Sequence, residues 1–493
     1  MSFYAMSFNN GERAISTTWE ECQDILKGKT KIQMKKFTSL DDAQRYLQGD
    51  CAKDHDIAIH QAGSFTASTK LTEEQHTIFE FFQRNSTSSL LITGPAGTGK
   101  SFLVGEIVRY LKHYNIPHGV TGSTGNAAVL IKGRTLHSFL GIGLGRRKAV
   151  ELVMDMSITY KRGLRKVHTI ILDEVSMISA ELLDKVSEVL KLVRSNTKPF
   201  GGIRMIFIGD ACQLPPVEGS FFFKSSEWEE LKPTIFHLNE LIRQGGDHLL
   251  QSMLKRLRWG ECTKDDYKVL KACAEKDWGD TLVRPTRLYA THKDVEIENE
   301  QALNELLSTG SRKVGSYKTE YKGSPTQLNK MKFWCKSSRI PESILLCDGL
   351  QVMVTWNFDT SNGIVNGTRG VIVDLTDDIV HIELVNKSRV AIPFVSVEYD
   401  DDTRNNNANV RFMPLRLAYA LTIHKCQGVT LDCAEMDLGR SIFEYGQAYT
   451  ALSRVKNLDS VKITALKRSS FRTHPQVIEF YQNIDKIMEQ GSH

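Results

Sequence analysis

The chain has 493 residues, of which 41% are hydrophobic and 25% are charged. This composition is typical of a globular protein and not of a disordered one, and the length predicts about three or four domains. Lysine and arginine exceed aspartate and glutamate by 63 − 58 = 5. So small an excess does not indicate a polyanionic partner, and only local clusters of charge can argue for one.

The cysteines and the hydropathy of the sequence limit the cellular compartments in which we expect the protein. The nine cysteines contain no C-x-x-C pair and follow no metal-binding spacing, so we expect reduced thiols in an intracellular protein. No apolar run approaches the ~20 residues of a membrane span, and the N-terminus lacks a signal-peptide core and the acid-poor composition of a transit peptide. We therefore expect a soluble protein with no membrane partner, for which a nucleus or a viral replication site is a compatible location.

The N-terminal segment, residues 1–50, is short and basic. Within ten positions that contain no acid it carries five lysines, Lys27, Lys29, Lys31, Lys35 and Lys36. Thr18 and Glu21 have the spacing of a capping box, which predicts the start of a helix. Residues 51–70 are small and polar without sustained periodicity, and this predicts a linker.

After the linker, apolar runs alternate with helix-like stretches. LLIT, TIIL and MIFIG have the composition of buried strands, and KSFLVGEIVRYL and AELLDKVSEVLKLV have the periodicity of helices. This alternation predicts an α/β fold in which helices cover a parallel sheet. From about residue 310 to residue 410 the pattern changes to short strand-like runs separated by turn residues, which predicts an inserted β-rich unit.

The strongest motif is GPAGTGKS, which follows an apolar strand and opens a helix. In this context G-x-x-x-x-G-K-[ST] is a phosphate loop, whose glycines let backbone N–H groups surround phosphates at a helix N-terminus. We expect Lys100 to reach the β- and γ-phosphates of ATP and the Ser101 hydroxyl to bind Mg²⁺. The predicted nucleotide-binding residues are Gly94, Pro95, Ala96, Gly97, Thr98, Gly99, Lys100, Ser101 and Phe102.

Two further strands deliver polar side chains to the same edge of the predicted sheet. Asp173 and Glu174 follow TIIL, and we expect Asp173 to hold Mg²⁺ while Glu174 orients and deprotonates the attacking water. The run MIFIGDACQLPPVEG places Gln213 as a polar sensor beside the γ-phosphate. These residues predict hydrolysis of a nucleotide.

In their order, the motifs resemble those of the superfamily-one helicases and, within them, of the Pif-type helicases. The resemblance covers roughly residues 71–466 and rests on LTEEQ, VTGSTGNAAVLIKGRTLHSFLGIGLG, ELLDKVSEVLKLVRSNTKPFGGI, HLNELIRQ, LRLAYALTIHKCQGVTLD and GQAYTALSRVKNL. It implies two RecA-like domains, residues 71–235 and residues 236–485. A wedge insertion at about 145–167 and a barrel-like β-rich insertion belong to the same pattern.

The resemblance implies an ATP-dependent DNA helicase that moves 5′ to 3′ along single-stranded DNA, opens forked duplexes and acts as a monomer. By the same resemblance Gln75 reads adenine, and Arg243 and Arg454 point at the γ-phosphate with Gln427 beside them. The implied contacts to single-stranded DNA are Ser123, Thr124, His137, Ser138, Phe139, Thr422, His424 and Lys425. Hydroxyls and a lysine hold phosphates without reading sequence, whereas Phe139 either stacks on a base or fills the core.

Residues 3–47 resemble the N-terminal hybrid-binding domain of eukaryotic type-one ribonuclease H, also called viroplasmin-like. The resemblance implies that Trp19 packs on the deoxyribose of an RNA/DNA hybrid, with double-stranded RNA as the other candidate ligand. Lys35 and Lys36 would then hold phosphates across the shallow minor groove. In the alternative interpretation Trp19 fills a very small core and the lysines form a solvated face.

The leading hypothesis is therefore an ATP-driven helicase that unwinds DNA and RNA/DNA hybrids and is tethered by its N-terminal domain. The alternative is a nucleic-acid-binding or anchoring protein that uses ATP as a conformational switch and unwinds little. A ribonuclease is not supported, because no cluster of carboxylates for two-metal cleavage follows the N-terminal domain.

Overall fold

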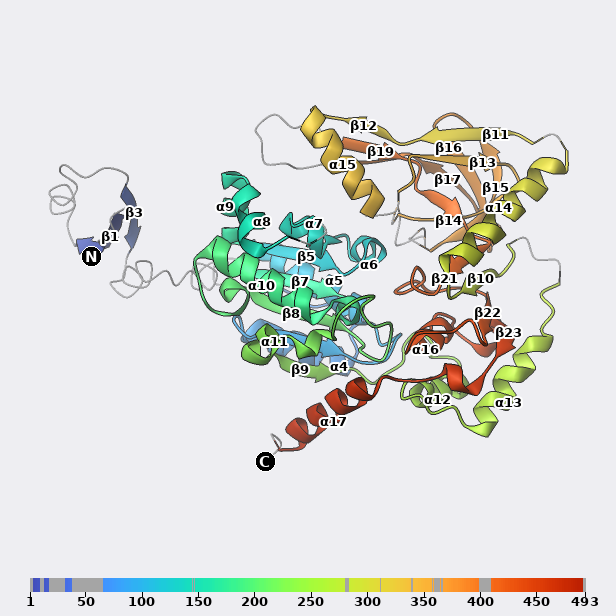
Figure 1. The fold of residues 1–493 in the computed structure, drawn as a ribbon, viewed down its shortest axis with the longest axis horizontal. Helices are drawn as coiled ribbons and strands as arrows, with labels where there is room; N and C mark the ends of the chain where they lie inside the picture. The colour runs from blue at the N-terminus through green and yellow to red at the C-terminus, as the bar shows by residue number, and fades with distance from the viewer. Residues whose placement is uncertain are drawn as a thin grey trace. The chain divides into compact units, whose positions relative to one another are not determined.

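The computed structural model describes residues 65–490 apart from short gaps, and three strands before them (Figure 1). The gaps are residues 144, 146, 280–282, 311, 338–339, 357, 359–363, 365–366 and 399–408. By its internal contacts the chain divides into two units. The first comprises Met1–Ala67 and Arg109–Ile116, and the second comprises Ser68–Val108 and Pro117–His493.

The first unit contains an antiparallel sheet in the order β2-β1-β3. Its strands are β1 (Phe3–Phe8), β2 (Arg13–Ser16) and β3 (Ile32–Phe37). Lys35 and Lys36 lie in β3, in register with Ala5 and Tyr4 of β1. Trp19 and the helix predicted to start at Thr18 lie outside the described residues.

The second unit begins with a domain, called the first domain below, that is built on a parallel sheet in the order β6-β5-β7-β8-β4-β9. The predicted runs LLIT, TIIL and MIFIG are strands of this sheet and are buried along their whole length. Continuous burial is what a parallel sheet under helices requires. The strands are β4 (Leu90–Thr93), β5 (His118–Gly122), β6 (Arg134–Thr135), β7 (Thr169–Asp173), β8 (Arg204–Gly209) and β9 (Thr234–His237).

The helices of this first domain include both of those that periodicity predicted, α5 and α10. They are α4 (Glu73–Arg84), α5 (Lys100–His113), α6 (Gly125–Leu130), α7 (Leu136–Leu140), α8 (Ala149–Asp155), α9 (Ile158–Lys166), α10 (Ala180–Arg194) and α11 (Ser226–Leu231). Ser179 caps α10 by accepting from the N–H of Leu182. The helix then buries Leu183, Val186 and Leu190 in the domain core, each worth roughly 1.5–3 kcal/mol by area.

The last helix of the chain, α17 (Pro475–Gln490), also packs in the core of the first domain. Its Val477, Tyr481 and Ile484 are buried there. Phe480 stacks on Phe223 with ring centroids 4.2 Å apart. This part of α17 thus belongs to the first domain's core, although about 240 residues separate it in sequence from β9.

A second parallel sheet has the order β21-β10-β22-β23. Its strands are β10 (Thr286–Tyr289), β21 (Ala420–Thr422), β22 (Ala434–Leu438) and β23 (Val461–Leu466). The accompanying helices are α12 (His248–Leu257), α13 (Lys264–Ala272), α14 (His292–Ser308) and α16 (Gln447–Leu452). Leu288, Met436 and Leu452 lie in the core that this sheet shares with its helices.

The predicted β-rich insertion is present, and its sheets are antiparallel, in the orders β17-β16-β15-β14-β20, β11-β13 and β12-β19-β18. The strands are β11 (Val314–Lys318), β12 (Glu320–Lys322), β13 (Ser343–Cys347), β14 (Gln351–Val354), β15 (Arg369–Leu375), β16 (Ile379–Leu384), β17 (Arg389–Pro393), β18 (Val395–Glu398), β19 (Asn409–Phe412) and β20 (Leu415–Leu417). A helix that the strand-like pattern did not predict, α15 (Pro325–Ser337), interrupts them. Met331 and Cys335, four residues apart on one face, bury it against Phe412.

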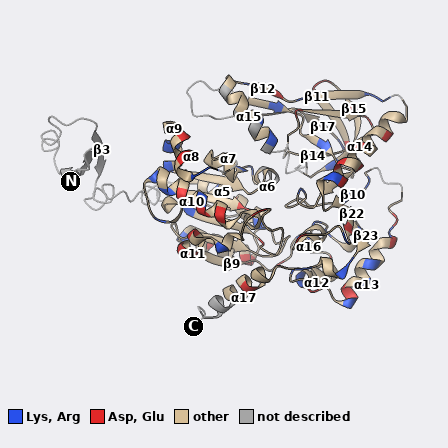
Figure 2. Ribbon diagram, viewed as in Figure 1, with Lys and Arg blue, Asp and Glu red and all other residues tan. Residues whose placement is uncertain are grey.

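The distribution of charge, the state of the cysteines and the hydropathy of the helices can each be compared with what the composition predicted. Basic and acidic residues are interspersed along the helices of the second unit (Figure 2). The cysteines in the described part of the chain are free thiols. Across the same residues, no helix combines the length and the apolar character that crossing a bilayer requires.

Candidate active site

The phosphate loop joins β4 to α5 in a conformation that requires glycine. Gly94 and Gly99 have φ angles of +146° and +76°. A Cβ at Gly94 would lie 2.2 Å from the carbonyl oxygen of Leu238, and one at Gly99 would lie 2.5 Å from Nε2 of Gln75. Only glycine combines these backbone angles with such close neighbours, which explains both motif positions.

Lys100, the first residue of α5, folds back over the loop. Its Nζ donates to the carbonyl oxygens of Gly94 and Pro95, each at 2.8 Å. Burial lowers the pKa of Lys100 to about 8, while the charges of Asp210, Glu174 and Asp173 raise it. The ammonium group therefore lies among carboxylates at the point where the sequence predicts the phosphates of a nucleotide.

Gln75 braces the phosphate loop from α4. Its Nε2 donates to the carbonyl oxygen of Thr98 at 3.1 Å, and its Oε1 accepts from the N–H of Thr72 at 3.2 Å. Thr72 and Gln75 form the capping box that starts α4. In this structure the amide of Gln75 is occupied by the loop and the helix start, and its predicted contact with adenine stays a prediction. Ser101 and Phe102 are exposed in the first turn of α5.

Asp173 and Glu174 lie side by side at the end of β7. Glu174 adopts the left-handed conformation, with φ +54°, and its N–H donates to Oδ1 of Asp173 at 2.8 Å. A side chain other than glycine in this region is uncommon and costs conformational energy, so the turn is held by its surroundings. Burial, and then the charge of Glu174, raise the pKa of Asp173 to about 7.

These side chains fit a magnesium ion. Mg²⁺ prefers hard oxygen ligands and commonly takes one or two carboxylates together with phosphates and water. The Asp173 carboxyl and the Ser101 hydroxyl supply such oxygens, and the raised pKa of Asp173 shows a buried carboxyl whose charge a cation would stabilise.

Glu174 and Gln213 of the first domain each form a hydrogen bond with a residue of the second domain. Nε2 of Gln427 donates to Oε2 of Glu174 at 2.9 Å. Nη2 of Arg454 donates to Oε1 of Gln213 at 3.2 Å. The partners are 253 and 241 positions apart in the sequence, so the fold brings together four residues that the motifs had predicted separately.

Arg243 and Arg454, the two arginines predicted to point at the γ-phosphate (the arginine fingers), both contact Ser453. Nη1 of Arg243 donates to the Ser453 carbonyl oxygen at 2.8 Å, and Nη2 of Arg454 donates to the Ser453 hydroxyl at 2.7 Å. Burial and the charge of Arg454 lower the pKa of Arg243 to about 9, although Glu174 raises it. Arg454 is buried and Arg243 is half-buried. Two guanidinium groups this close together repel each other, and a polyphosphate between the domains would offset this repulsion.

In the first domain, the residues predicted to contact single-stranded DNA begin next to Asp173 and Glu174. Gly122, which ends β5, is in register with Asp173 of β7. Ser123 follows directly, and its N–H donates to the Asp173 carbonyl oxygen at 3.1 Å. Thr124 caps the next turn by accepting from the N–H of Ala127 at 3.2 Å. Single-stranded DNA bound at Ser123 and Thr124 would thus lie close to the acidic pair of the nucleotide site.

His137, Ser138 and Phe139 lie in α7 and are half-buried. Burial lowers the pKa of His137, so neutral imidazole is favoured near pH 7. Phe139 packs against the domain core, and a Cβ at Gly119 of β5 would lie 2.2 Å from its ring. The packing role weighed for Phe139 is therefore present, and base stacking by this ring stays a prediction.

The predicted strand contacts of the second domain follow β21. Thr422 ends that strand, is buried, and accepts from the N–H of Lys425 at 3.2 Å through its hydroxyl. His424 and Lys425 lie in the turn that follows and are half-buried. Each RecA-like sheet thus carries its candidate contacts at the carboxyl ends of parallel strands.

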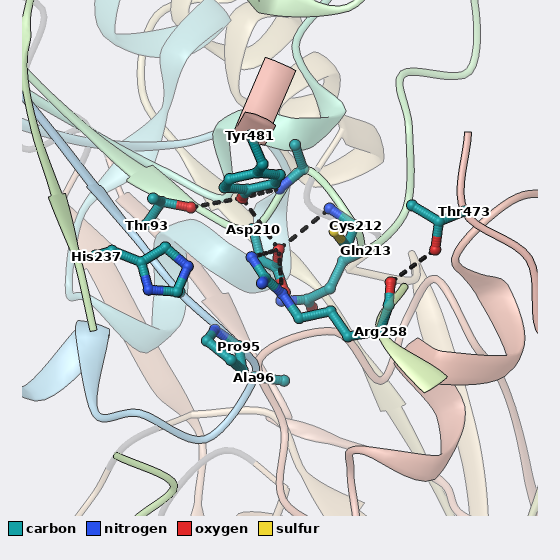
Figure 3. Close-up of polar contacts among 12 residues, drawn as sticks. Thr93, Pro95, Ala96, Asp210, Cys212, Gln213, His237, Arg258, Thr473 and Tyr481 are labelled. Carbon is teal, nitrogen blue, oxygen red and sulfur yellow. Dashed lines mark hydrogen bonds and ion pairs between the residues drawn. The ribbon is translucent and has the colours of Figure 1, made fainter. Parts of the chain in front are cut away.

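A buried polar cluster at the base of the site contains residues that sequence reasoning missed (Figure 3). Arg258 forms an ion pair with Asp210 at 3.0 Å, with side-chain exposures of 3% and 0%. The Tyr449 hydroxyl donates to Oδ2 of Asp210 at 3.4 Å and accepts from the N–H of Ala96 at 3.1 Å. Tyr481 of α17 contacts the other oxygen of Asp210. Tyr449 lies inside a quoted motif, whereas no motif signalled Arg258 or Tyr481.

Two parallel sheets, one carrying a phosphate loop and an acidic pair and the other supplying the buried Arg454 across the interface, define a P-loop nucleotide hydrolase with two RecA-like domains. Family models match three segments. They are a PIF1-like helicase model at residues 70–263, a DNA helicase Pif1 2B domain model at residues 337–375 and a ribonuclease H1 N-terminal domain model at residues 3–47.

Known proteins resemble the chain over most of its length. The uncharacterized protein 030L of Invertebrate iridescent virus 6 is 31% identical, with 81% of this chain and 92% of that protein covered. The ATP-dependent DNA helicase PIF1 of Homo sapiens is 35% identical, and the match covers 85% of this chain but only 64% of the human protein. The chain thus corresponds to a little under two thirds of the human relative.

Solved structures agree with this assignment. The crystal structure of Pif1 helicase from Candida albicans superposes with a TM-score of 0.71 at 33% identity, covering 85% of this chain and all of that one. A structure describing DNA unwinding at forked double-stranded DNA by two coordinating Pif1 helicases superposes with a TM-score of 0.59 at 25% identity, covering 85% and 98%. The chain belongs to the PIF1-like helicases, a family of ATP-dependent DNA helicases.

Proposed function

We propose that this protein is an ATP-driven motor that moves 5′ to 3′ along single-stranded DNA and opens forked duplexes. The observation that carries the proposal is the pair of interdomain bonds, Glu174 to Gln427 and Gln213 to Arg454. Because the candidate general base and sensor each contact the second domain, hydrolysis can depend on closure of the two domains. The relative described with forked DNA supports the choice of substrate.

The proposed chemistry assigns one task to each candidate. Lys100 holds the β- and γ-phosphates, and Glu174 takes the proton of the attacking water. Arg243 and Arg454 stabilise the charge that develops on the γ-phosphate. Ser101 and Asp173 would hold Mg²⁺, which supplies positive charge to the same oxygens when it is bound, and Gln213, Gln75 and Gln427 orient the groups around the nucleotide.

The strand would run over both domains. Ser123 and Thr124 on one side and Thr422 and Lys425 on the other offer hydroxyl and ammonium groups to successive phosphates, with His137, Ser138, Phe139 and His424 beside them. Such contacts do not read sequence, so we expect binding that is independent of sequence and that weakens steeply with salt. ATP-dependent closure would move one set of contacts relative to the other, and this movement is the step of translocation.

A strand-displacement assay on a forked DNA duplex tests the motor against its alternative. With ATP and Mg²⁺, the motor releases the labelled strand, and the yield falls to background when a non-hydrolysable nucleotide replaces ATP. An ATP-switched anchoring protein binds the same fork in a nucleotide-dependent way but releases no strand. Nucleotide-dependent binding without strand release would therefore overturn the proposed activity in favour of the alternative.

The N-terminal domain adds a tether for RNA-containing duplexes, and through it the motor also acts on RNA/DNA hybrids. The family-model match at residues 3–47 supports this part of the proposal, and Lys35 and Lys36 in β3 are its candidate phosphate contacts together with Trp19. Replacing both lysines by alanine in the full chain should weaken hybrid binding. The slope of log K against log salt concentration should become shallower by about two, because two phosphate contacts are lost. An unchanged salt slope would remove the two lysines from the interface.

A further inference from the structure

Tyr481 of α17 has a fully used hydroxyl at the base of the ATP site (Figure 3). The Tyr481 side chain is buried, with 2% exposure, and its oxygen lies 2.7 Å from Oγ1 of Thr93. The N–H of Ala211 donates to the same oxygen at 3.2 Å, and the hydroxyl donates to Oδ1 of Asp210 at 3.2 Å. A phenol has one hydrogen to donate and two lone pairs to accept with, so the Thr93 hydroxyl is the donor in its pair.

These contacts connect two loops that the proposed chemistry uses. Thr93 ends β4 and directly precedes Gly94, the first residue of the phosphate loop. Asp210 and Ala211 follow β8 and lead into Gln213, the residue that contacts Arg454. The two strands are neighbours, in register at Thr93 and Gly209. The Tyr481 hydroxyl therefore bridges the ends of adjacent strands and sets the phosphate loop against the sensor loop.

We propose that Tyr481 is a positioning residue for ATP hydrolysis, contributed by a helix that lies beyond the last helicase motif. The proposal rests on the ATPase function proposed above and deepens it. The C-terminal helix then does more than cover apolar surface, because it fixes the distance between the group that binds the phosphates and the group that senses the γ-phosphate. Its contribution depends on the hydroxyl and not on the ring alone.

The surroundings hold Tyr481 in place from both sides. On α17 itself, the stack of Phe480 on Phe223 fixes the helix against the first domain. On the other side, the guanidinium of Arg258 lies 4.7 Å from the centre of the Tyr481 ring and pairs with Asp210. Thr473, just before α17, donates to the carbonyl oxygen of Arg258 at 2.6 Å. A hydroxyl held this firmly can define the geometry of the loops it joins.

Loss of the bridge should change turnover more than affinity. ATP binding is spread over many backbone N–H groups of the phosphate loop and the charge of Lys100, so a small shift of the sensor loop leaves most of it intact. Transition-state stabilisation requires the sensor and finger to be aligned with the loop, and it is sensitive to small displacements. We therefore expect Tyr481→Phe to lower kcat by about three- to tenfold, the equivalent of one hydrogen bond, with KM for ATP changed less than about twofold.

The experiment is a double-mutant cycle on the full chain. Tyr481→Phe removes the hydroxyl and keeps the ring, and Thr93→Val removes the other end of the bond with little change of volume. DNA-stimulated ATP turnover gives kcat and KM for each variant and for the pair, and thermal unfolding gives their stability. Ile484→Val is the matched control, since it removes buried packing one turn further along the same helix and its side chain makes no hydrogen bond.

The expected result is a loss of kcat in both single variants that is not multiplied in the double variant, while Ile484→Val lowers the unfolding temperature and keeps kcat within about twofold of wild type. A wild-type kcat in Tyr481→Phe, multiplicative losses in the cycle, or an equal loss of kcat in Ile484→Val would overturn the positioning role. If Tyr481→Phe fails to fold, Thr93→Val decides alone by the same criterion. A wild-type chain without DNA-stimulated turnover would instead contradict the proposed function itself.

Discussion

Replacing Glu174 by Gln is the sharpest test of the proposed chemistry. The substitution keeps the size of the side chain, and an amide oxygen can still accept the bond that Nε2 of Gln427 donates at 2.9 Å. Interdomain closure should therefore survive, while the charge and the proton acceptor are lost. A positioned general base contributes typically 10²–10⁴ in rate, which corresponds to about 3–5 kcal/mol of activation free energy.

The assay measures ATP turnover at saturating ATP, Mg²⁺ and single-stranded DNA, and binding of a fluorescent nucleotide in parallel. We expect turnover to fall by about 100-fold or more and the nucleotide Kd to stay within about threefold of wild type. Glu188→Gln makes the same chemical change on the exposed side of α10 and should leave both quantities unaltered. Turnover at the wild-type rate in Glu174→Gln would refute the assignment of Glu174 as the general base.

Two further predictions concern the ATP site, and a third concerns the N-terminal segment. Lys100→Ala should reduce phosphate release to background, because the charge at the β- and γ-phosphates is removed, and residual turnover above a few per cent would contradict this role. Arg243→Ala and Arg454→Ala should each lower kcat by about 100-fold or more at nearly unchanged nucleotide affinity, and the double variant should lose less than the product, since both side chains contact the same serine. Deletion of residues 1–50 should leave turnover on single-stranded DNA unchanged and weaken binding to RNA/DNA hybrid in titrations at one fixed salt concentration, whereas equal hybrid affinity would exclude the proposed tether.

The parts of the site that the sequence predicted are those written in short, local patterns. Gly94 and Gly99 are needed for backbone angles within a single loop, and Asp173 and Glu174 directly follow the buried strand that places them. Because parallel strands end at the same edge of a sheet, consecutive strand–loop segments could be placed side by side without coordinates. The alternation of apolar runs with helix-like stretches predicted the α/β fold, and the change to short strand-like runs predicted the β-rich insertion.

The remaining parts depend on contacts that no local pattern encodes. Arg258 and Asp210 are 48 positions apart, and Tyr481 is 271 positions from Asp210. A single arginine or tyrosine on an amphipathic helix has the same appearance in a sequence whether it covers apolar surface or completes a polar cluster. The helix α15 was missed for a different reason, since Pro325 at its first position suits a helix start as well as a turn.

Unwinding polarity tests the central claim most directly. Two partial duplexes with the same base-paired region, one carrying a 5′ single-stranded tail and the other a 3′ tail, are incubated with the full chain, ATP and Mg²⁺ under single-turnover conditions. A motor that steps 5′ to 3′ between its two RecA-like domains displaces the strand from the 5′-tailed duplex and leaves the 3′-tailed duplex intact. Preferential displacement from the 3′-tailed duplex, or displacement from neither, would contradict the account.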